Sequence, residues 1–328
     1  MSQISQSINN FKNVPDACPG TSSQTAGQAS ICKGCPNQEA CLTKNPIIDP
    51  DMDYIKRRME SVQKKIIILS GKGGVGKSMF TAQLAWCLSA NKKQVGILDI
   101  DLCGPSIPTI MGCNNERIHS SGSGWTPVYI TDNISIMSIE FMLPSAEDAI
   151  IWRGAKKNGL IKQFLKDVEW PDLDYLLIDT PPGTSDEHMS IVQFLKESGV
   201  DGAVLITTPQ EVSLLDVRKE VNFCRKIGLP ILGIVENMSI FICPHCHNSS
   251  YIFKANTGGA YAFSKEMDIN FLGEIPLDPE IRNACDEGLN FLEEYPDSLA
   301  SQAILKIANG KLFNTNIIFN LMSKKSFL

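Results

Sequence analysis

The stretch that decides the fold is KIIILSGKGGVGKS, residues 65–78. Its first part, 65–70, is a run of aliphatic residues, which predicts a strand buried on both faces. Its second part has the pattern G-x4-G-K-S and leads into a helix-length segment, 78–90. Glycines in such a loop let backbone N–H groups surround phosphates, and the start of the helix favours negative charge. The stretch therefore predicts a phosphate-binding loop between a strand and a helix.

Within this loop two side chains have separate expected roles. Lys77 would reach the β- and γ-phosphates of a nucleoside triphosphate, and Ser78 would ligate Mg²⁺. A glycine-rich turn without a ligand is the competing interpretation. The other residues expected to contact the nucleotide are Gly71, Lys72, Gly73, Gly74, Val75 and Gly76.

Outward from the loop, short apolar runs alternate with longer amphipathic segments. This alternation predicts βαβ units and an α/β fold with a doubly wound, mostly parallel sheet. The further runs expected as buried strands are 94–100, 174–180, 203–208 and 231–237.

The two ends of the chain differ from this pattern. Residues 1–60 are rich in Ser, Gln, Asn, Gly and Pro and are expected to form a flexible, cysteine-bearing arm. Residues 61–308 are expected to form the nucleotide-binding domain, and 309–328 a tail to which the pattern assigns no role.

The overall composition and charge argue against some classes of partner. A hydrophobic content of 43% with 20% charged residues is ordinary for a globular protein with a sizeable core. The net charge of -6 argues against nucleic acid as the default partner. No apolar run approaches the roughly 18 residues of a membrane span, and the N-terminus lacks a targeting pattern. We therefore expect a cytoplasmic protein without a membrane or nucleic-acid partner.

Aspartates stand at the ends of two predicted strands, where an open parallel sheet places groups that contact ligands. Asp99 lies at the end of the run 94–100 and Asp101 directly follows it, and Asp179 lies at the end of the run 174–180. Asp99 and Asp179 are candidate Mg²⁺ ligands, since hard cations prefer carboxylate oxygens. An ordinary helix cap is the alternative for Asp99.

Four cysteines of the arm follow the spacing Cys18-x13-Cys32-x2-Cys35-x5-Cys41. Four thiolates in one short segment indicate a metal or cluster site. The asymmetric spacing is closer to that of [4Fe-4S] ligands than to the paired C-x2-C elements of zinc sites. Zinc and unligated thiols remain open from the residues alone.

A second C-x2-C, Cys243-Pro244-His245-Cys246, follows the predicted strand 231–237. Two ligands do not close a metal site. Half a zinc ribbon, with His245 or His247 as further ligands, a redox pair and a simple turn are equally open from the residues.

Several motifs together resemble one family. These are GKGGVGKS, DIDLCGPSIP, LIDTPPGTSDEH, ENMS and CPHC. They are similar to the Mrp/Nbp ATPases of iron-sulfur cluster assembly, within the deviant Walker A class that includes MinD, ParA and the nitrogenase iron protein. The arm cysteines resemble those of the eukaryotic cytosolic branch that carries an N-terminal cluster.

The resemblance implies a set of roles at the nucleotide site. Lys72 would cross a dimer interface to the partner's nucleotide, although an ordinary solvated loop lysine is the alternative. Asp101 would orient the attacking water in a slow ATPase whose catalytic residues include Lys72 and Lys77. Asp179 would hold Mg²⁺ through water, and Asn237 would contact adenine.

The resemblance also implies the cargo and the partners. One [4Fe-4S] cluster would lie in the arm, and a labile one would be shared between the Cys243 and Cys246 pairs of two subunits. The expected assembly is a homodimer or a heterotetramer with a paralogous scaffold ATPase lacking the arm. The expected function is ATP-dependent transfer of clusters to cytosolic and nuclear apoproteins.

Other functions and some departures from the family pattern stay open. A zinc-stabilised, ParA/MinD-like ATPase organising DNA or surfaces is the main alternative, and a reductase of the nitrogenase iron protein type is another. Ala155 and Ile240 stand where the family usually has proline and glycine, and Ile240 puts the local turn in question. Cys103 either senses the nucleotide or packs.

Overall fold

The computed structural model describes residues 25, 27–35, 38–43, 49, 51–143, 154–243, 246, 248–310 and 313. The chain divides into two compact units, residues 1–54 and 55–328. The first unit contains a short 3-10 helix, η1 (Ser30–Cys32), and helix α1 (Gln38–Thr43). The amide of Gln38 donates from Nε2 to the carbonyl of Gly27 at 3.0 Å and ties the two pieces of this unit together.

A sheet of nine strands among the described residues forms the centre of the second unit, in the order β10-β9-β8-β1-β7-β2-β6-β5, with β11 also pairing with β9. The pairs from β9 through β6 are parallel, whereas β5 and β10 run antiparallel to their neighbours. The predicted doubly wound fold is therefore confirmed. The strands are β1 (Val62–Leu69), β2 (Val95–Asp99), β5 (Val128–Thr131), β6 (Ile134–Ser138), β7 (Leu173–Asp179), β8 (Gly202–Thr207), β9 (Ile231–Ile242), β10 (Ser249–Ser250) and β11 (Phe271–Leu277), with a separate hairpin of β3 (His119–Ser120) and β4 (Trp125–Thr126).

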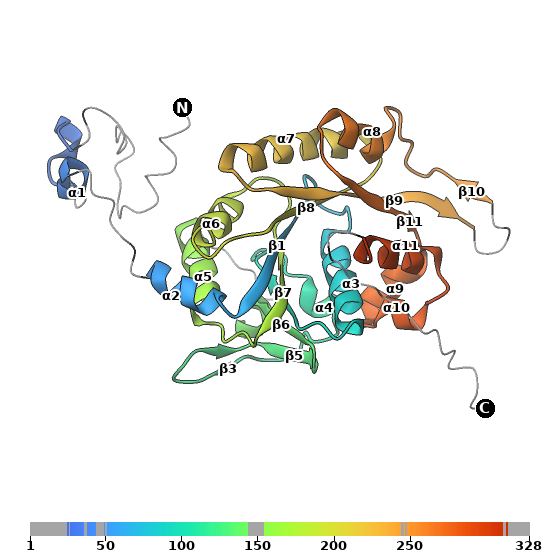
Figure 1. Cartoon of the computed structure of the whole chain (residues 1–328), viewed down its shortest axis with the longest axis horizontal. Coiled ribbons are helices and arrows are strands. Elements are labelled where there is room, and N and C mark those ends of the chain that lie inside the picture. The colour runs from blue at the N-terminus through green and yellow to red at the C-terminus, as the bar shows by residue number, and fades with distance from the viewer. Residues whose placement is uncertain are drawn as a thin grey trace. The chain divides into compact units, whose positions relative to one another are not determined.

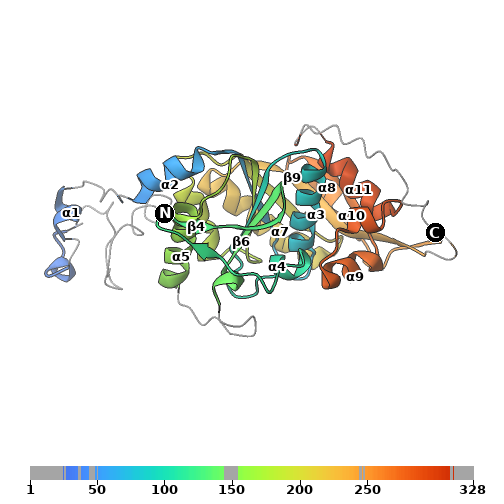
Figure 2. The ribbon, with the colours of Figure 1, turned by 90° about the horizontal axis from the view of Figure 1, so that it is seen from below.

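Helices cover both faces of the sheet (Figures 1 and 2). Helices α3, α10 and α11 pack together on one face, and α5 packs on α6 and α7 on α8 on the other. The helices are α2 (Asp51–Met59), α3 (Lys77–Ala90), α4 (Ile107–Ile110), η2 (Ile139–Met142), α5 (Gly154–Asp167), α6 (Asp186–Phe194), α7 (Glu211–Ile227), α8 (Gly259–Glu266), α9 (Pro279–Glu287), α10 (Phe291–Glu294) and α11 (Leu299–Ala308).

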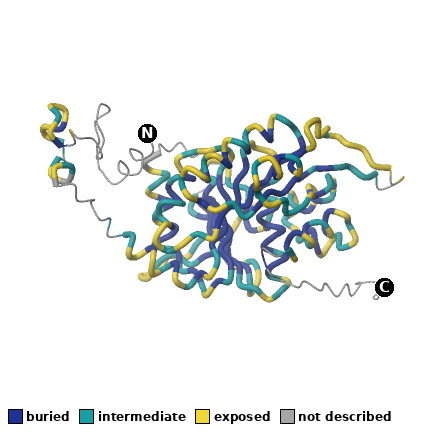
Figure 3. The backbone as a smooth tube through the Cα atoms, turned by 45° about the horizontal axis from the view of Figure 1, so that its top comes forward, coloured by how far each residue is buried: buried dark blue, intermediate teal, exposed yellow. Residues whose placement is uncertain are grey.

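Strand β1 shows why the apolar runs lack alternation. Ile66 and Ile68 belong to the core cluster that contains the apolar side of α3, and Ile67 and Leu69, equally buried, are outside that cluster. Successive side chains of a strand point to opposite faces, so a strand covered on both faces is apolar at every position. The central strands accordingly form the buried core of the second unit (Figure 3).

Strand β9 is the longest of the described strands and leaves the body of the sheet. Its middle residues are buried, whereas 240–242 are only half-buried and β10 is exposed (Figure 3). The backbone N–H of Cys243 donates to the carbonyl of Asn248 at 3.0 Å and closes a β9–β10 hairpin. Cys243 thus lies where this hairpin leaves β9.

The tail also has one docked residue. Most of 309–328 lies outside the described residues, but Phe313 is buried and its carbonyl accepts a hydrogen bond from the Tyr175 hydroxyl at 2.8 Å. This residue extends the core beyond α11.

Candidate functional site

The loop Gly71–Ser78 connects β1 to α3, as predicted. Gly74 and Gly76 have φ of 78° and 84°, a conformation that side-chain-bearing residues rarely adopt. A Cβ on Gly71 would lie 2.6 Å from the backbone carbon of Asp216, so α7 packs directly against the loop. The glycines are required here by backbone shape and by close approach.

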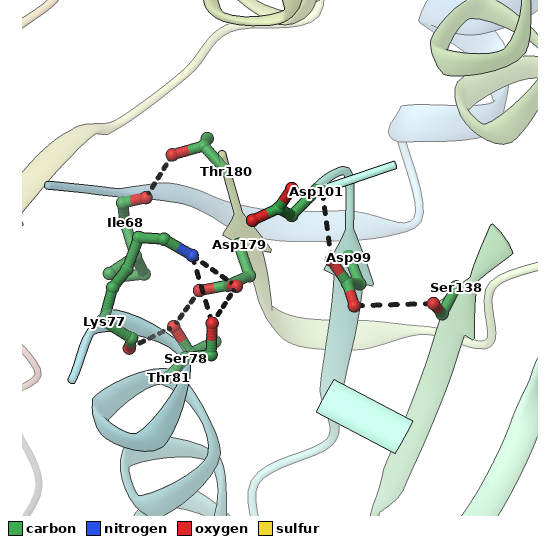
Figure 4. A network of polar contacts seen from close by, with 9 residues as sticks. All are labelled: Ile68, Lys77, Ser78, Thr81, Asp99, Asp101, Ser138, Asp179 and Thr180. Atoms are coloured by element: carbon green, nitrogen blue, oxygen red, sulfur yellow. Dashed lines mark hydrogen bonds and ion pairs between the residues drawn. The ribbon is translucent and has the colours of Figure 1, made fainter. Parts of the chain in front are cut away.

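Behind the loop, Asp179 at the end of β7 accepts hydrogen bonds from three side chains of α3 (Figure 4). Its Oδ2 accepts from Lys77 Nζ at 2.5 Å and from Ser78 Oγ at 2.6 Å, and its Oδ1 accepts from Thr81 Oγ1 at 2.7 Å. Both Lys77 and Asp179 are buried, so the ion pair is little screened by water. The predicted pair of Ser78 and Asp179 is thus brought together.

Thr81 was not among the residues singled out from the sequence. It lies one helical turn after Lys77, and its Oγ1 is also 3.1 Å from the Lys77 carbonyl oxygen. Its hydroxyl fixes which oxygen of Asp179 faces Lys77 and Ser78. The available signal was its spacing: residues four apart lie on the same face of a helix.

Asp99 and Asp101 lie on the neighbouring strand end (Figure 4). Asp99 is fully buried, and its carboxyl accepts from the Asp101 backbone N–H at 3.0 Å and from Ser138 Oγ at 3.4 Å. Burial, followed by the negative charge of Asp179, raises the pKa of Asp99 well above its usual value. Its hydrogen bond to the Asp101 backbone shapes the turn that carries Asp101.

Asp101 is half-buried, close enough to Lys77 for their charges to interact. Burial raises the pKa of Asp101, although the charge of Lys77 opposes the rise.

The segment after β7 is fixed against the loop by its own backbone and side chains. Thr180 Oγ1 donates to the Ile68 carbonyl at 2.7 Å, and the Gly183 N–H donates to the Ser70 carbonyl at 2.7 Å. Further on, His188 Nδ1 accepts from the Ser185 N–H at 3.0 Å, and burial lowers the pKa of His188 to about 4. His188 is therefore neutral at physiological pH.

A largely apolar cavity of about 650 Å³ opens beside the loop. Such a volume is typical of small-molecule sites. Asn237 of β9 lines it and donates from Nδ2 to the Val75 carbonyl at 2.9 Å. Other lining residues are Gly76, Met79, Pro105, Leu277 and Ile281.

Cys103 is exposed beside a charged pair of α5 and α6. Lys157 Nζ donates to Glu187 Oε1 at 2.7 Å, and hydrogen bonds to Glu187 and then to Cys103 raise the pKa of Lys157 to about 12. The exposure of Cys103 does not support the interpretation as a packing residue.

The grouped cysteines lie in two places. Cys243 is half-buried at the end of β9 and Cys246 is exposed. In the arm, the Cys35 N–H donates to the Cys32 carbonyl at 3.1 Å, so these two residues share one turn, while Cys18 lies outside the described residues. Within the described part of the chain, no three His, Cys, Asp or Glu side chains form a group that could hold a metal ion.

Two sequence features resolve without a site. Ile240 is an ordinary residue of β9 with negative φ, so no glycine is needed there and the doubt about a local turn falls away. Residue 155 lies within α5.

None of the helices that the structure describes is long and apolar enough to cross a membrane.

A glycine-rich loop between strand and helix, with a serine hydroxyl and a strand-end carboxylate meeting behind it, defines a P-loop nucleoside triphosphatase. Residues 61–311 match the family described as NUBPL iron-transfer P-loop NTPase, and the chain belongs to that family. The resemblance to iron-sulfur assembly ATPases and the expectation of an NTPase are confirmed.

Similar proteins agree with this family. A cytosolic Fe-S cluster assembly factor NBP35 from Kluyveromyces lactis is 60% identical over 296 residues, 89% of this chain and 90% of that protein. A nucleotide-binding protein in complex with ADP from Archaeoglobus fulgidus is 38% identical, covers 75% of this chain and 94% of its own, and has a TM-score of 0.65. The cell division ATPase MinD of Pyrococcus furiosus is 26% identical, with 75% and 97% coverage and a TM-score of 0.53.

Proposed function

We propose that the chain is an ATP-dependent scaffold that assembles [4Fe-4S] clusters and passes them to cytosolic and nuclear apoproteins. The family and the named cytosolic relative support this proposal and a cytosolic location. The observation that carries it is one strand: β9 contacts the phosphate loop through Asn237 and ends at Ile242, directly before Cys243 of the CPHC motif.

Lys77, Ser78 and Asp179 form the phosphate and metal end of the site. The Ser78 hydroxyl and the Asp179 carboxylate are hard oxygen ligands that meet at 2.6 Å, a donor set that suits Mg²⁺. When bound there, Mg²⁺ would neutralise charge on the phosphates. Asp99 remains a candidate ligand, but its burial and its hydrogen bonds favour a role in positioning Asp101.

Asn237 supports ATP as the nucleotide. Its Nδ2 donates one hydrogen bond to the Val75 carbonyl, which fixes the amide at the edge of the cavity and leaves its second N–H and its carbonyl oxygen for a base. Its carbonyl oxygen would accept a hydrogen bond from the amino group of adenine.

Hydrolysis in this proposal uses Asp101 to orient water and Lys72 to act across an interface. Lys72 is exposed in the loop, where a second subunit can approach it, whereas Lys77 is buried. The subunit partner is either a second copy of the chain or a paralogue without the arm.

Two clusters are proposed. Cys18, Cys32, Cys35 and Cys41 would hold one in the arm, where a backbone hydrogen bond places Cys32 and Cys35 in one turn. The transferable cluster would be shared by Cys243 and Cys246 of two subunits, because two thiolates per chain leave half of a four-iron cluster without protein ligands.

The nucleotide assignment is tested with two lysine variants. Lys77→Ala is expected to abolish binding of Mg-ATP measured by titration calorimetry, with the circular dichroism spectrum unchanged. Lys72→Ala is expected to keep most of the binding and to lose ATPase activity and nucleotide-dependent dimerisation. An unaltered hydrolysis rate in Lys72→Ala would contradict its role across the interface.

Sharing of the cluster is tested with mixed dimers. One subunit carries Cys243→Ala and Cys246→Ala, and the other is wild type with a different affinity tag. We expect the mixed dimer to lose the whole transferable cluster. Retention of half the iron would show independent sites in each subunit.

A further inference from the structure

Strand β9 contains an unusual backbone conformation at Met238. Three non-glycine residues of the described part of the chain have positive φ: Lys92, Met238 and Asp268, at 59°, 57° and 50°. Lys92 and Asp268 each follow a helix cap, where the left-handed conformation commonly ends a helix. Met238 instead lies inside a strand, where this conformation is not expected and a side chain makes it costly.

The pairing of β9 changes at the same point. Glu236 is the last residue of β9 in register with β8. Asn237 then pairs with Ile275 of β11, and the next partners are Phe241 and Leu277, so β9 bulges between them. Ser239 Oγ donates to the Ile275 carbonyl at 3.2 Å and anchors the bulged segment by a side chain.

The bulge lies directly beside the nucleotide loop. Asn237, the residue before it, is hydrogen-bonded to the Val75 carbonyl, and a Cβ on Gly76 would lie 2.2 Å from Asn237 Nδ2. Asn237 and Met238 both line the cavity beside the loop. The bulge is therefore in direct contact with the nucleotide loop through Asn237, and with the cavity through Asn237 and Met238.

Beyond the bulge, β9 leads only to the cysteine hairpin. Cys243 lies five positions after Met238, which at about 3.3 Å per residue is on the order of 15 Å. Among the described residues this part of the strand is held by the Ser239–Ile275 hydrogen bond and by short pairings with β10 and β11, so its direction depends on the backbone at Met238.

We propose that Met238 is a positioning residue whose left-handed backbone conformation couples the nucleotide site to the orientation of the hairpin that bears Cys243 and Cys246. Left-handed and extended conformations are separate basins, so the residue can switch between two discrete states. Residues held in such conformations often occur at switches and ligand sites. A nucleotide that contacts one state more favourably shifts the population of the hairpin orientation. The inference rests on the proposed function, because it names how nucleotide reaches the cluster-bearing segment.

The test is hydrogen exchange of the full-length, anaerobically purified protein, with and without saturating Mg-ADP, followed at residues 239–243 and 248–252. In wild type we expect nucleotide to change exchange by about fivefold or more, the lower end of ordinary coupling between sites. Met238→Asn removes the same side chain but tolerates the left-handed conformation, so it should keep this change. Met238→Val is β-branched and disfavours that conformation, so it should lose the change at a Mg-ADP concentration that saturates the variant, as set by its own measured affinity.

A second variant covers the case in which Met238→Val does not fold. Ser239→Ala removes the side-chain anchor to Ile275 and should reduce the nucleotide-dependent change in the hairpin, with the exchange of the central strands unaltered. Equal changes in wild type, Met238→Val and Ser239→Ala would overturn the inference, as would loss of the change in Met238→Asn. Iron content of the same samples is a separate readout: iron binding without any nucleotide effect on the hairpin overturns the coupling alone, and protein that binds no iron overturns the scaffold.

Discussion

Thr81 offers the sharpest test of the buried network around Asp179. Thr81→Val replaces a fully buried hydroxyl by a methyl group of similar shape and leaves Asp179 Oδ1 without the bond at 2.7 Å. A hydrogen bond to a charged group contributes about 1.5–3 kcal/mol, and the abandoned oxygen stays buried. We therefore expect the free energy of unfolding to fall by about 2 kcal/mol.

The assay is urea unfolding followed by circular dichroism, without nucleotide or Mg²⁺. For a unit of this size the same loss corresponds to a Tm lower by roughly 4–8 °C. Thr81→Ser is the matched control, because it keeps the hydroxyl and loses one methyl group, at a cost of about 1 kcal/mol. A Val variant as stable as wild type, or more stable than the Ser variant, would refute the reasoning.

Three further predictions concern other buried groups. Burial lowers the pKa of His188 from 6.5 to about 4, so the unfolded chain takes up a proton at this histidine before the folded protein does, and the free energy of unfolding falls by about 3 kcal/mol between pH 6.5 and pH 4. His188→Asn should flatten that part of the pH profile of urea unfolding. An unchanged profile would count against this prediction. Gly71→Ala should destabilise by about 1–3 kcal/mol, because its Cβ would meet the Asp216 backbone at 2.6 Å; an unchanged Tm would contradict that clash. Phe313→Ala should cost about 3–5 kcal/mol, since the ring is buried; a loss below about 1 kcal/mol in urea unfolding would show that the tail is not docked.

The parts predictable from the sequence are those fixed by local pattern. The run 65–70 lacks alternation because β1 is covered on both faces, and that same feature identified the other central strands. The phosphate loop was predictable because its glycines and Lys77 have a fixed spacing imposed by the ligand they serve. Strand β6 was missed, although its five residues are all buried, because its pattern ISIMS mixes serines with apolar residues.

Other features depend on contacts between distant segments. Thr81 became part of the site only when β7 brought Asp179 against α3, across 98 residues of chain. The left-handed backbone at Met238 has no sequence signal, since methionine does not favour it and a glycine would be the usual residue. The full burial of Asp99 likewise follows from strands that pair on both of its sides.

The central claim is that this ATPase carries iron-sulfur clusters on both cysteine groups. The most direct test is the iron, sulfide and zinc content per chain of anaerobically reconstituted protein, measured in wild type and in a form lacking residues 1–45. One four-iron cluster per arm and one shared between two chains predict about six irons per wild-type chain and about two in the truncated form, each with equal sulfide. Stoichiometric zinc in place of iron, or the same iron content in both forms, would contradict the account.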